Sequence, residues 1–210
     1  MKKSLIVLAV VIVAAGIFAA NSKFVKRYYY VYFKTDDMFV EADVDSFDKG
    51  PEVGSPMPAI RGVLDGNEVT DIASLAGSNG TVFVVNRSLE WCPFCMRQSI
   101  ELQNMKDQFD ANGIAIIMMT YDDPTIQDAF VSRHSIEYPV LSDVNAESFA
   151  NLQVLREEYG PDDAQYGLPY PGMFVVGTDG VIKGKLFIEA YSYRVDTNAV
   201  LNFATEHLLK

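Results

Sequence analysis

The stretch Thr81–Cys95, with the sequence TVFVVNRSLEWCPFC, decides the fold of this chain of 210 residues. Its first five residues are β-branched or aromatic, a composition typical of a buried strand. Beyond the two cysteines, apolar residues recur on one helical stripe, at Ile100, Leu102, Met105 and Phe109. A strand that leads through a short loop into a helix places both cysteines at the N-terminus of that helix.

Further strands and helices alternate along the rest of the chain. The sequence predicts strands over residues 114–120, 139–141, 173–176 and 181–187, and helices over 96–110, 124–133, 146–159 and a last one capped by Asp196 or Thr197. The Thr178-Asp179-Gly180 turn between the last two strands is typical of a hairpin. We therefore expect an α/β fold with helices on both faces of a mixed central sheet.

The spacing of Cys92 and Cys95 favours redox chemistry. Unpaired backbone N–H groups and the helix dipole stabilise a thiolate at a helix N-terminus and lower its pKa. Pro93 suits the first helical turn, where its missing N–H costs nothing. Cys92 is therefore the expected attacking thiol, and Cys95, one turn deeper, is expected to resolve the mixed disulfide. Glu90 is a candidate to exchange a proton with Cys95, although a solvated loop residue is its simpler interpretation.

Two other interpretations of the cysteine pair are open. A zinc site needs two more soft or imidazole ligands, and the chain offers only His134 and His207, which lie in unrelated elements. An inert pair of core cysteines is the second. Redox chemistry through the pair itself remains the favoured one, and we expect no metal and no bound cofactor.

The segment Trp91-Cys92-Pro93-Phe94-Cys95 after a hydrophobic strand resembles the active site of the thioredoxin superfamily, and its Cys-Pro-Phe-Cys core is also similar to that of glutaredoxins. Three other motifs resemble the redoxin branch that includes the alkyl hydroperoxide reductase/thiol-specific antioxidant (AhpC/TSA) family. They are GSPMP at 54–58, YPVLSD at 138–143 and PYPGMFVV at 169–176. The similarity spans about residues 51–208 and implies a thioredoxin-like fold with a redoxin-type helix–strand insertion at about 124–142.

The resemblance also implies roles for residues around the cysteines. Pro171 is expected to be the superfamily's cis-proline, facing the cysteine pair, although it and Pro169 are open to interpretation as plain turn prolines. The residues expected to line the active site are Trp91, Pro93, Phe94, Tyr170 and Pro171.

The peroxide-binding pattern of typical peroxiredoxins is missing. Their sites resemble Pro-x-x-x-Thr/Ser-x-x-Cys, with a distant arginine that helps to position the peroxide. Here the proline and hydroxyl positions hold Val85 and Leu89. No arginine adjoins Pro171, and the nearest in sequence are Arg156 and Arg194.

The sequence therefore predicts a thiol–disulfide oxidoreductase that acts on protein thiols or disulfides and exchanges electrons with an upstream redox partner. The alternative is an antioxidant thiol peroxidase of the peroxiredoxin type, with Cys92 peroxidatic and Cys95 resolving. In that case Arg87 and Ser88 are candidates for a variant peroxide site. A second alternative is a non-enzymatic, tethered binding module that has kept the fold.

The N-terminal residues predict attachment to a membrane. Residues 5–20 (LIVLAVVIVAAGIFAA) are all apolar or small and follow a basic start. The length of this run lies between that of a signal-peptide hydrophobic core and that of a membrane-spanning helix. Phe18 interrupts the small-x-small pattern expected before a cut after Ala20. Residues 1–22 are therefore expected to be a signal-anchor rather than a cleaved signal peptide.

Residues 23–50 connect this segment to a domain expected over residues 51–210. Their first part interleaves basic and aromatic residues, which suits either a membrane–water interface or an ordinary amphipathic connector helix. Residues 35–50 (TDDMFVEADVDSFDKG) are acidic and are expected to be a solvated linker.

The distribution of charge bears on location and partners. Counting basic residues on each side of the apolar run favours a cytoplasmic domain. The short basic leader and the lack of further cysteines favour the exported, periplasmic or extracytoplasmic side, which we expect. The net charge of −11 disfavours nucleic acid as a partner.

Overall fold

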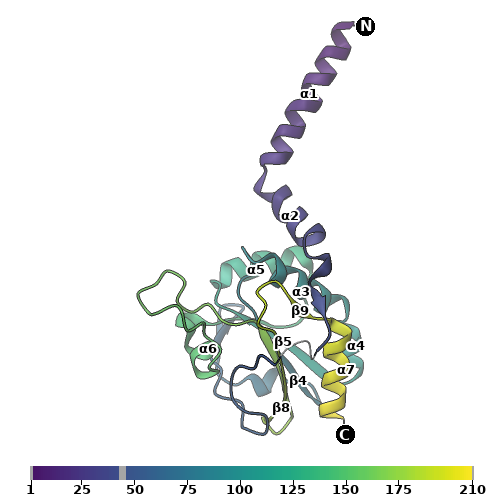
Figure 1. Ribbon diagram of the computed structural model, residues 1–210. Helices are drawn as coiled ribbons and strands as arrows, with labels where there is room; N and C mark the ends of the chain where they lie inside the picture. The colour runs from purple at the N-terminus through teal and green to yellow at the C-terminus, as the bar shows by residue number, and fades with distance from the viewer. Residues whose placement is uncertain (1, 43–45, 210) are drawn as a thin grey trace.

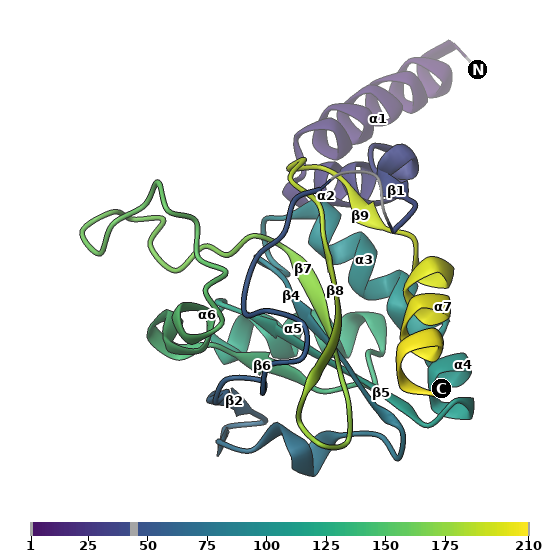
Figure 2. The same cartoon turned by 60° about the horizontal axis from the view of Figure 1, so that its bottom comes forward.

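The hydrophobic run before the cysteines forms an interior strand of a seven-stranded mixed sheet in the computed structural model, which describes residues 2–42 and 46–209. The strand order is β3-β2-β6-β5-β4-β7-β8, in which β4, β5 and β6 are parallel and the other neighbours antiparallel. Figure 1 labels β4, β5 and β8 of this sheet, and Figure 2 also labels β2, β6 and β7. The strands are β2 (Gly62–Leu64), β3 (Asn67–Val69), β4 (Gly80–Val85), β5 (Ile114–Thr120), β6 (Val140–Ser142), β7 (Gly172–Val176) and β8 (Ile182–Phe187).

Helices cover both faces of this sheet, as predicted for a thioredoxin-like fold. They are α3 (Pro93–Asn104), α4 (Lys106–Ala111), α5 (Pro124–His134), α6 (Glu147–Asn151) and α7 (Thr197–Leu208). Every residue of β4 is buried, and alternate side chains enter different clusters. Val84 packs in the cluster of α3, α4, α5 and α7, whereas Phe83 packs with Phe149 of α6. Figure 2 shows α6 and α7 on opposite sides of the sheet. Burial on both faces explains why this strand is continuously hydrophobic.

The predicted insertion is present as α5 and β6, and the predicted strands and final helix lie within two residues of their expected bounds. The helix predicted over 96–110 is interrupted at Met105, whose ψ of 1° is not helical, and so becomes α3 and α4.

The helix predicted over 146–159 was wrong beyond Asn151. Gln153 has a φ of 56°, in the left-handed region, and the chain then becomes extended. The carbonyl of Val154 accepts a hydrogen bond from the backbone N–H of Tyr170 (2.7 Å), and Leu155 pairs with Pro169. The apolar residues that suggested a longer helix therefore pair with the segment before β7.

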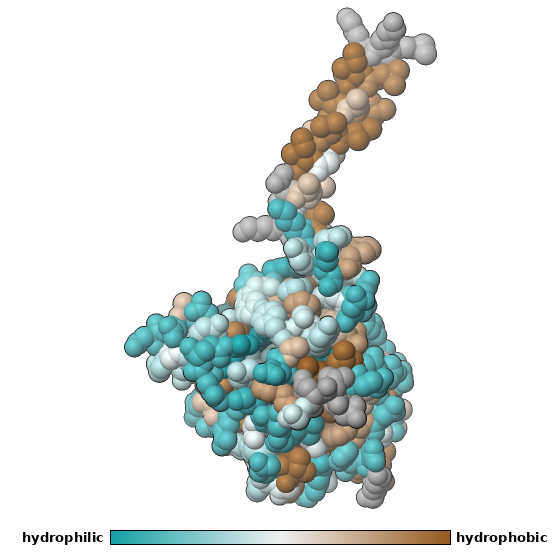
Figure 3. All heavy atoms as spheres, viewed as in Figure 1, coloured by the Kyte–Doolittle hydropathy of each residue, from teal (hydrophilic) through white to brown (hydrophobic). Residues whose placement is uncertain are grey.

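The N-terminus forms α1 (Lys2–Asn21) and α2 (Lys23–Phe33). The apolar side chains of α1 are exposed, and Figure 3 shows this helix as a hydrophobic rod that extends from the folded domain. Among the described residues, no single helix has the length and apolarity needed to cross a membrane, whereas Ser4–Ala20 and Val25–Phe33 together have them, across a bend of 66°. α2 packs against α3 through Val31, which is buried.

Part of the expected solvated linker packs on the domain instead. Thr35 and Met38 are buried, and β1 (Phe39–Val40) pairs in parallel with β9 (Arg194–Val195). The acidic residues that suggested solvation alternate here with apolar ones that the domain buries. Asp43 and Asp45 of the same linker lie outside the described residues.

We predict that the segment containing β1 contributes to the stability of the folded domain. Met38→Ala should lower the free energy of unfolding by about 2 kcal/mol or more, because Met38 is only 2 % exposed and its loss leaves a cavity. Urea unfolding of the full chain measures this change. The control is Val53→Ala, at an exposed position, which should change it by less than about 0.5 kcal/mol. Equal effects of the two substitutions would contradict the packing of this segment.

Candidate active site

The cysteine pair lies where the chain passes from β4 into α3. Cys92 is the N-cap residue of α3, and its Sγ accepts a hydrogen bond from the backbone N–H of Cys95 (3.3 Å). Pro93 occupies the first turn, as predicted. The two cysteines form a disulfide, with their Cα atoms 5.3 Å apart, and both are completely buried. The positive end of the helix dipole is therefore directed at the sulfur that would carry a thiolate.

Hydrogen bonds fix the loop that precedes Cys92. The Ser88 hydroxyl oxygen accepts from the backbone N–H groups of Glu90 (3.0 Å) and Trp91 (3.2 Å). The backbone N–H of Leu89 donates to Oδ2 of Asp122 (2.6 Å), at the end of β5. Leu89, at the sequence position of the hydroxyl residue in the peroxiredoxin pattern, is apolar and packs in the core.

Asp122 is a site residue that sequence analysis missed. Besides the Leu89 N–H, its Oδ2 accepts a hydrogen bond from the Thr120 hydroxyl (3.0 Å). Burial raises the pKa of this carboxyl above its ordinary value, and the hydrogen bonds oppose that rise. Asp122 thus ties the loop before Cys92 to the neighbouring strand.

Arg194 is the second residue missed, and it contacts the reactive atoms. Its Nη2 donates to Sγ of Cys95 (3.3 Å) and, at longer range, to Sγ of Cys92 (3.9 Å). Its Nη1 donates to the backbone carbonyls of Tyr193 (2.6 Å) and Tyr191 (3.3 Å), which orient the guanidinium. Arg194 lies 99 residues beyond Cys95, so no local motif linked the two.

A second buried guanidinium lies beside the first. Arg87 donates from Nη2 to the carbonyl of Tyr191 (2.6 Å), and its Cζ lies 3.7 Å from the centroid of the Tyr191 ring. Burial lowers the pKa of Arg87 to about 10. Burial and the Arg87 charge lower the pKa of Arg194 well below its ordinary value.

Among the described residues, neither buried arginine forms an ion pair with a carboxylate. Nε of both and Nη1 of Arg87 are buried without a hydrogen-bond partner in residues 2–42 and 46–209. Two positive charges thus lie near a neutral disulfide, with no acidic side chain to balance them in the part of the chain that the structure describes.

Two aromatic residues adjoin Cys92 and Cys95 in the sequence, and each contacts a tyrosine from another part of the chain. The indole N–H of Trp91 donates to the hydroxyl of Tyr121 (3.2 Å), and the ring of Phe94 meets that of Tyr191 edge-on. A cavity of about 630 Å³ separates α2 from the start of α3, and its lining residues are Arg27, Tyr30, Glu90, Trp91, Pro93 and Met96. Of the predicted site residues, Trp91, Pro93 and Glu90 line this cavity and Phe94 contacts Tyr191. The proton-exchange role of Glu90 stays a prediction.

The expected cis-proline was wrong. The described residues contain no cis peptide bond, so the bond before Pro171 is trans. Pro171 nevertheless borders a small cavity together with Arg194, close to the cysteine pair. The ring of Tyr170 contacts Phe47 (centroids 5.1 Å apart) and the Arg156 guanidinium (4.9 Å from its centroid), so the contacts that the structure gives it are away from the sulfurs.

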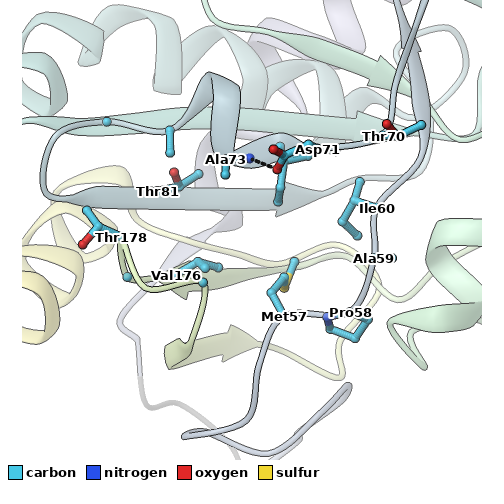
Figure 4. Close-up of a pocket in the computed structure, with 15 residues that line it drawn as sticks. Met57, Pro58, Ala59, Ile60, Thr70, Asp71, Ala73, Thr81, Val176 and Thr178 are labelled. Atoms are coloured by element: carbon cyan, nitrogen blue, oxygen red, sulfur yellow. Dashed lines mark hydrogen bonds between the residues drawn. The ribbon is translucent and has the colours of Figure 1, made fainter.

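Another cavity, of about 340 Å³, lies at the opposite end of β4 from the cysteines (Figure 4). It adjoins Thr81 and Val176, which pair at the start of β4, whereas Val85 pairs with Gly172 at its end. Its one acidic side chain, Asp71, accepts a hydrogen bond from the backbone N–H of Ala73. Among residues 2–42 and 46–209, no group of three or more His, Cys, Asp or Glu side chains could hold a metal ion.

Residues 53–185 match the sequence profile of the AhpC/TSA family. Solved structures with a similar fold include the peroxidoxin BcpB from Mycobacterium tuberculosis (TM-score 0.61, 18 % identity, 75 % of this chain and 96 % of that one). They also include the bacterioferritin comigratory protein of Xanthomonas campestris (TM-score 0.59, 18 % identity, 77 % of this chain and 98 % of that one). A third is a mutant of peroxiredoxin 6 of Arenicola marina (TM-score 0.64, 15 % identity, 74 % of this chain and 72 % of that one). No curated protein sequence matches the chain.

We predict opposite effects of pH on stability for two adjacent carboxyls. Because burial raises the pKa of Asp122, the folded state holds its proton more tightly than the unfolded state. This contribution favours folding in acid and is lost as the pH rises from about 4 through the raised pKa. Relative to Asp122→Asn, the wild type should therefore lose stability over that rise, measured by urea unfolding at a series of pH values.

Asp123→Asn is the matched control. Hydrogen bonds from Thr125 lower the pKa of the exposed Asp123, so its contribution is present above pH 4 and is lost as the pH falls through the lowered pKa. The same pH trend in both variants would contradict the assignment of Asp122 as a buried carboxyl.

Proposed function

This chain belongs to the AhpC/TSA family of thiol oxidoreductases, and we propose that its Cys92/Cys95 couple exchanges thiols and disulfides with protein substrates. The observation that supports this most is the combination of a disulfide at the N-terminus of α3 with an apolar Leu89 at the usual hydroxyl position. A dithiol at a helix N-terminus is suited to thiol–disulfide exchange. A peroxide would lack the hydroxyl that orients it in the peroxiredoxin pattern.

In the proposed cycle, Cys92 is the sulfur that forms the mixed disulfide. Cys92 lies between Trp91 and Pro93, which both line the cavity beside α2, so the partner approaches from that side. Cys95 lies one turn further into the helix and resolves the intermediate. Both sulfurs are buried, so the covering side chains must move before a protein thiol reaches them.

A thiol peroxidase is the second candidate, and Arg194 is the observation that favours it. An arginine near the reactive sulfur belongs to the peroxiredoxin pattern, and Arg194 supplies one from an element beyond the matched residues. In that reaction Cys92 would attack a peroxide, become a sulfenic acid and form the disulfide with Cys95.

We further propose that α1 and α2 tether the domain to a membrane on the exported side, where an upstream redox partner exchanges electrons with it. The support is the exposed apolar surface of α1 and the exposed rings of Tyr28, Tyr29 and Phe33 on α2, which suit a lipid interface. The acidic charge disfavours nucleic acid as a partner.

Stopped-flow oxidation of the reduced full-length chain tests the choice between disulfide and peroxide. Trp91 is the single tryptophan and adjoins Cys92, so its fluorescence reports the reaction. We expect cystine to react rapidly and hydrogen peroxide at a rate within about tenfold of that of a free thiol. Peroxide oxidation that is many orders of magnitude faster would assign the protein as a peroxidase.

The individual cysteine variants provide the controls. Cys92→Ser should abolish rapid oxidation by cystine, because the attacking sulfur is gone. Cys95→Ser should retain the first step and accumulate the mixed disulfide, because its resolving thiol is missing. Mass spectrometry identifies this adduct, and its accumulation in Cys92→Ser instead would reverse the assigned roles.

A further inference from the structure

We infer that Arg194 makes the Cys92–Cys95 disulfide an oxidant of dithiols, because its guanidinium is placed to hold the Cys95 thiolate that leaves when Cys92 is attacked. This inference rests on the proposed thiol–disulfide exchange. It adds the direction of electron flow, the class of substrate and a residue that determines both.

The geometry distinguishes the two sulfurs. Nη2 of Arg194 lies 3.3 Å from Sγ of Cys95 and 3.9 Å from Sγ of Cys92. Cys92 has a separate donor, the backbone N–H of Cys95 at the start of α3. Each sulfur therefore has a donor suited to a thiolate, and the charged donor lies nearer to Cys95, the leaving group.

The balance of charge around the disulfide also favours a thiolate on Cys95. The disulfide is neutral, and Arg194 is 4 % exposed with no carboxylate partner among the described residues. The charge of the buried Arg87 nearby further disfavours the charge on Arg194. A buried, unpaired guanidinium is costly, and a thiolate formed beside it would compensate the charge. Reduction of the disulfide supplies that anion.

The reaction conserves atoms and electrons. A thiolate of a partner dithiol attacks Sγ of Cys92, the Cys92–Cys95 bond breaks, and its electron pair remains on Cys95 as a thiolate beside Arg194. The second thiolate of the partner then attacks the partner's sulfur in the mixed disulfide and releases Cys92. The partner becomes a disulfide, the couple gains two electrons, and the protons of the partner thiols pass to solvent or to the released sulfurs.

The fold holds the guanidinium in position through elements that lie far apart in sequence. Nη1 of Arg194 donates to the carbonyls of Tyr191 and Tyr193, while its backbone in β9 pairs with Phe39 of β1. The charged group is therefore not a mobile surface side chain that any counter-ion could attract. Stabilising the reduced state raises the reduction potential of a couple, so the fixed charge favours the uptake of electrons.

Redox titration of the full-length chain against glutathione tests the inference. The equilibrium constant for reduction of the disulfide should fall at least about tenfold in Arg194→Met, the effect of losing one hydrogen bond to a charged group. Arg194→Lys keeps the charge but not the forked donor, so its equilibrium constant should lie between those of the wild type and Arg194→Met. The control Arg97→Met removes a charge two residues from Cys95 that pairs with Glu101, and it should leave the constant within about twofold.

A second readout separates this positioning role from a general structural one. Thiolate absorbance near 240 nm is followed against pH in the Cys92→Ser and Cys95→Ser backgrounds. Arg194→Met should move the midpoint of Cys95 thiolate formation upward in the first background, and by more than it moves that of Cys92 in the second. If Arg194→Met does not fold, the same comparison with Arg194→Lys decides.

The outcomes distinguish this inference from the proposed function. Failure of the wild type to exchange with glutathione at all would overturn the proposed function and the inference with it. Normal exchange with the same equilibrium constant in Arg194→Met and Arg97→Met would overturn only the inference. An equal shift of both thiolate midpoints would also contradict it, because the charge would then not favour Cys95.

Discussion

The contact between a buried guanidinium and a disulfide is the interaction on which the rest of this site depends. Arg194 lies against both sulfurs, and the helix N-terminus of α3 lies against Cys92, so positive charge surrounds a bond that carries none. No carboxylate of the described residues compensates it. The thiolates of the reduced couple would supply the missing negative charge, which links the electrostatics of the fold to redox chemistry.

The scaffold produces this arrangement from two directions. β4 is buried on both faces and delivers the cysteines to the start of α3, where Asp122 and Ser88 hold the intervening loop. The arginine lies on β9, close to the C-terminal end of the chain, and β9 is paired with β1. Because β1 follows α2 in the chain, the segment that leads from the N-terminal helices also supports the active site. The packing of α2 on α3 places a cavity between the two, beside Cys92.

Local patterns in the sequence were sufficient for the strand, the cysteine loop and the helix, because each depends on residues close together. They failed where distant segments meet. Arg194 was noted only as one of the two arginines nearest to Pro171 in sequence, and nothing near it in sequence indicates that its side chain contacts the cysteines. The extended pairing of Val154 and Leu155 with residues before β7 likewise ended a helix that local periodicity favoured. The turn between β2 and β3, in contrast, could be predicted from local sequence. Asp65 and Gly66 both have positive φ there, and an Asp-Gly pair is a recognisable hairpin signal.

Comparison of the stability of the oxidised and reduced protein tests the central claim most directly. A disulfide usually stabilises a folded chain, whereas a folded state that favours the reduced couple more than the unfolded chain does is more stable after reduction, by thermodynamic linkage. Urea unfolding at pH 7, with the cysteines either bridged or kept reduced, measures the difference. We expect a higher midpoint for the reduced protein. A higher midpoint for the oxidised protein would show that the folded state favours the disulfide and would contradict this claim.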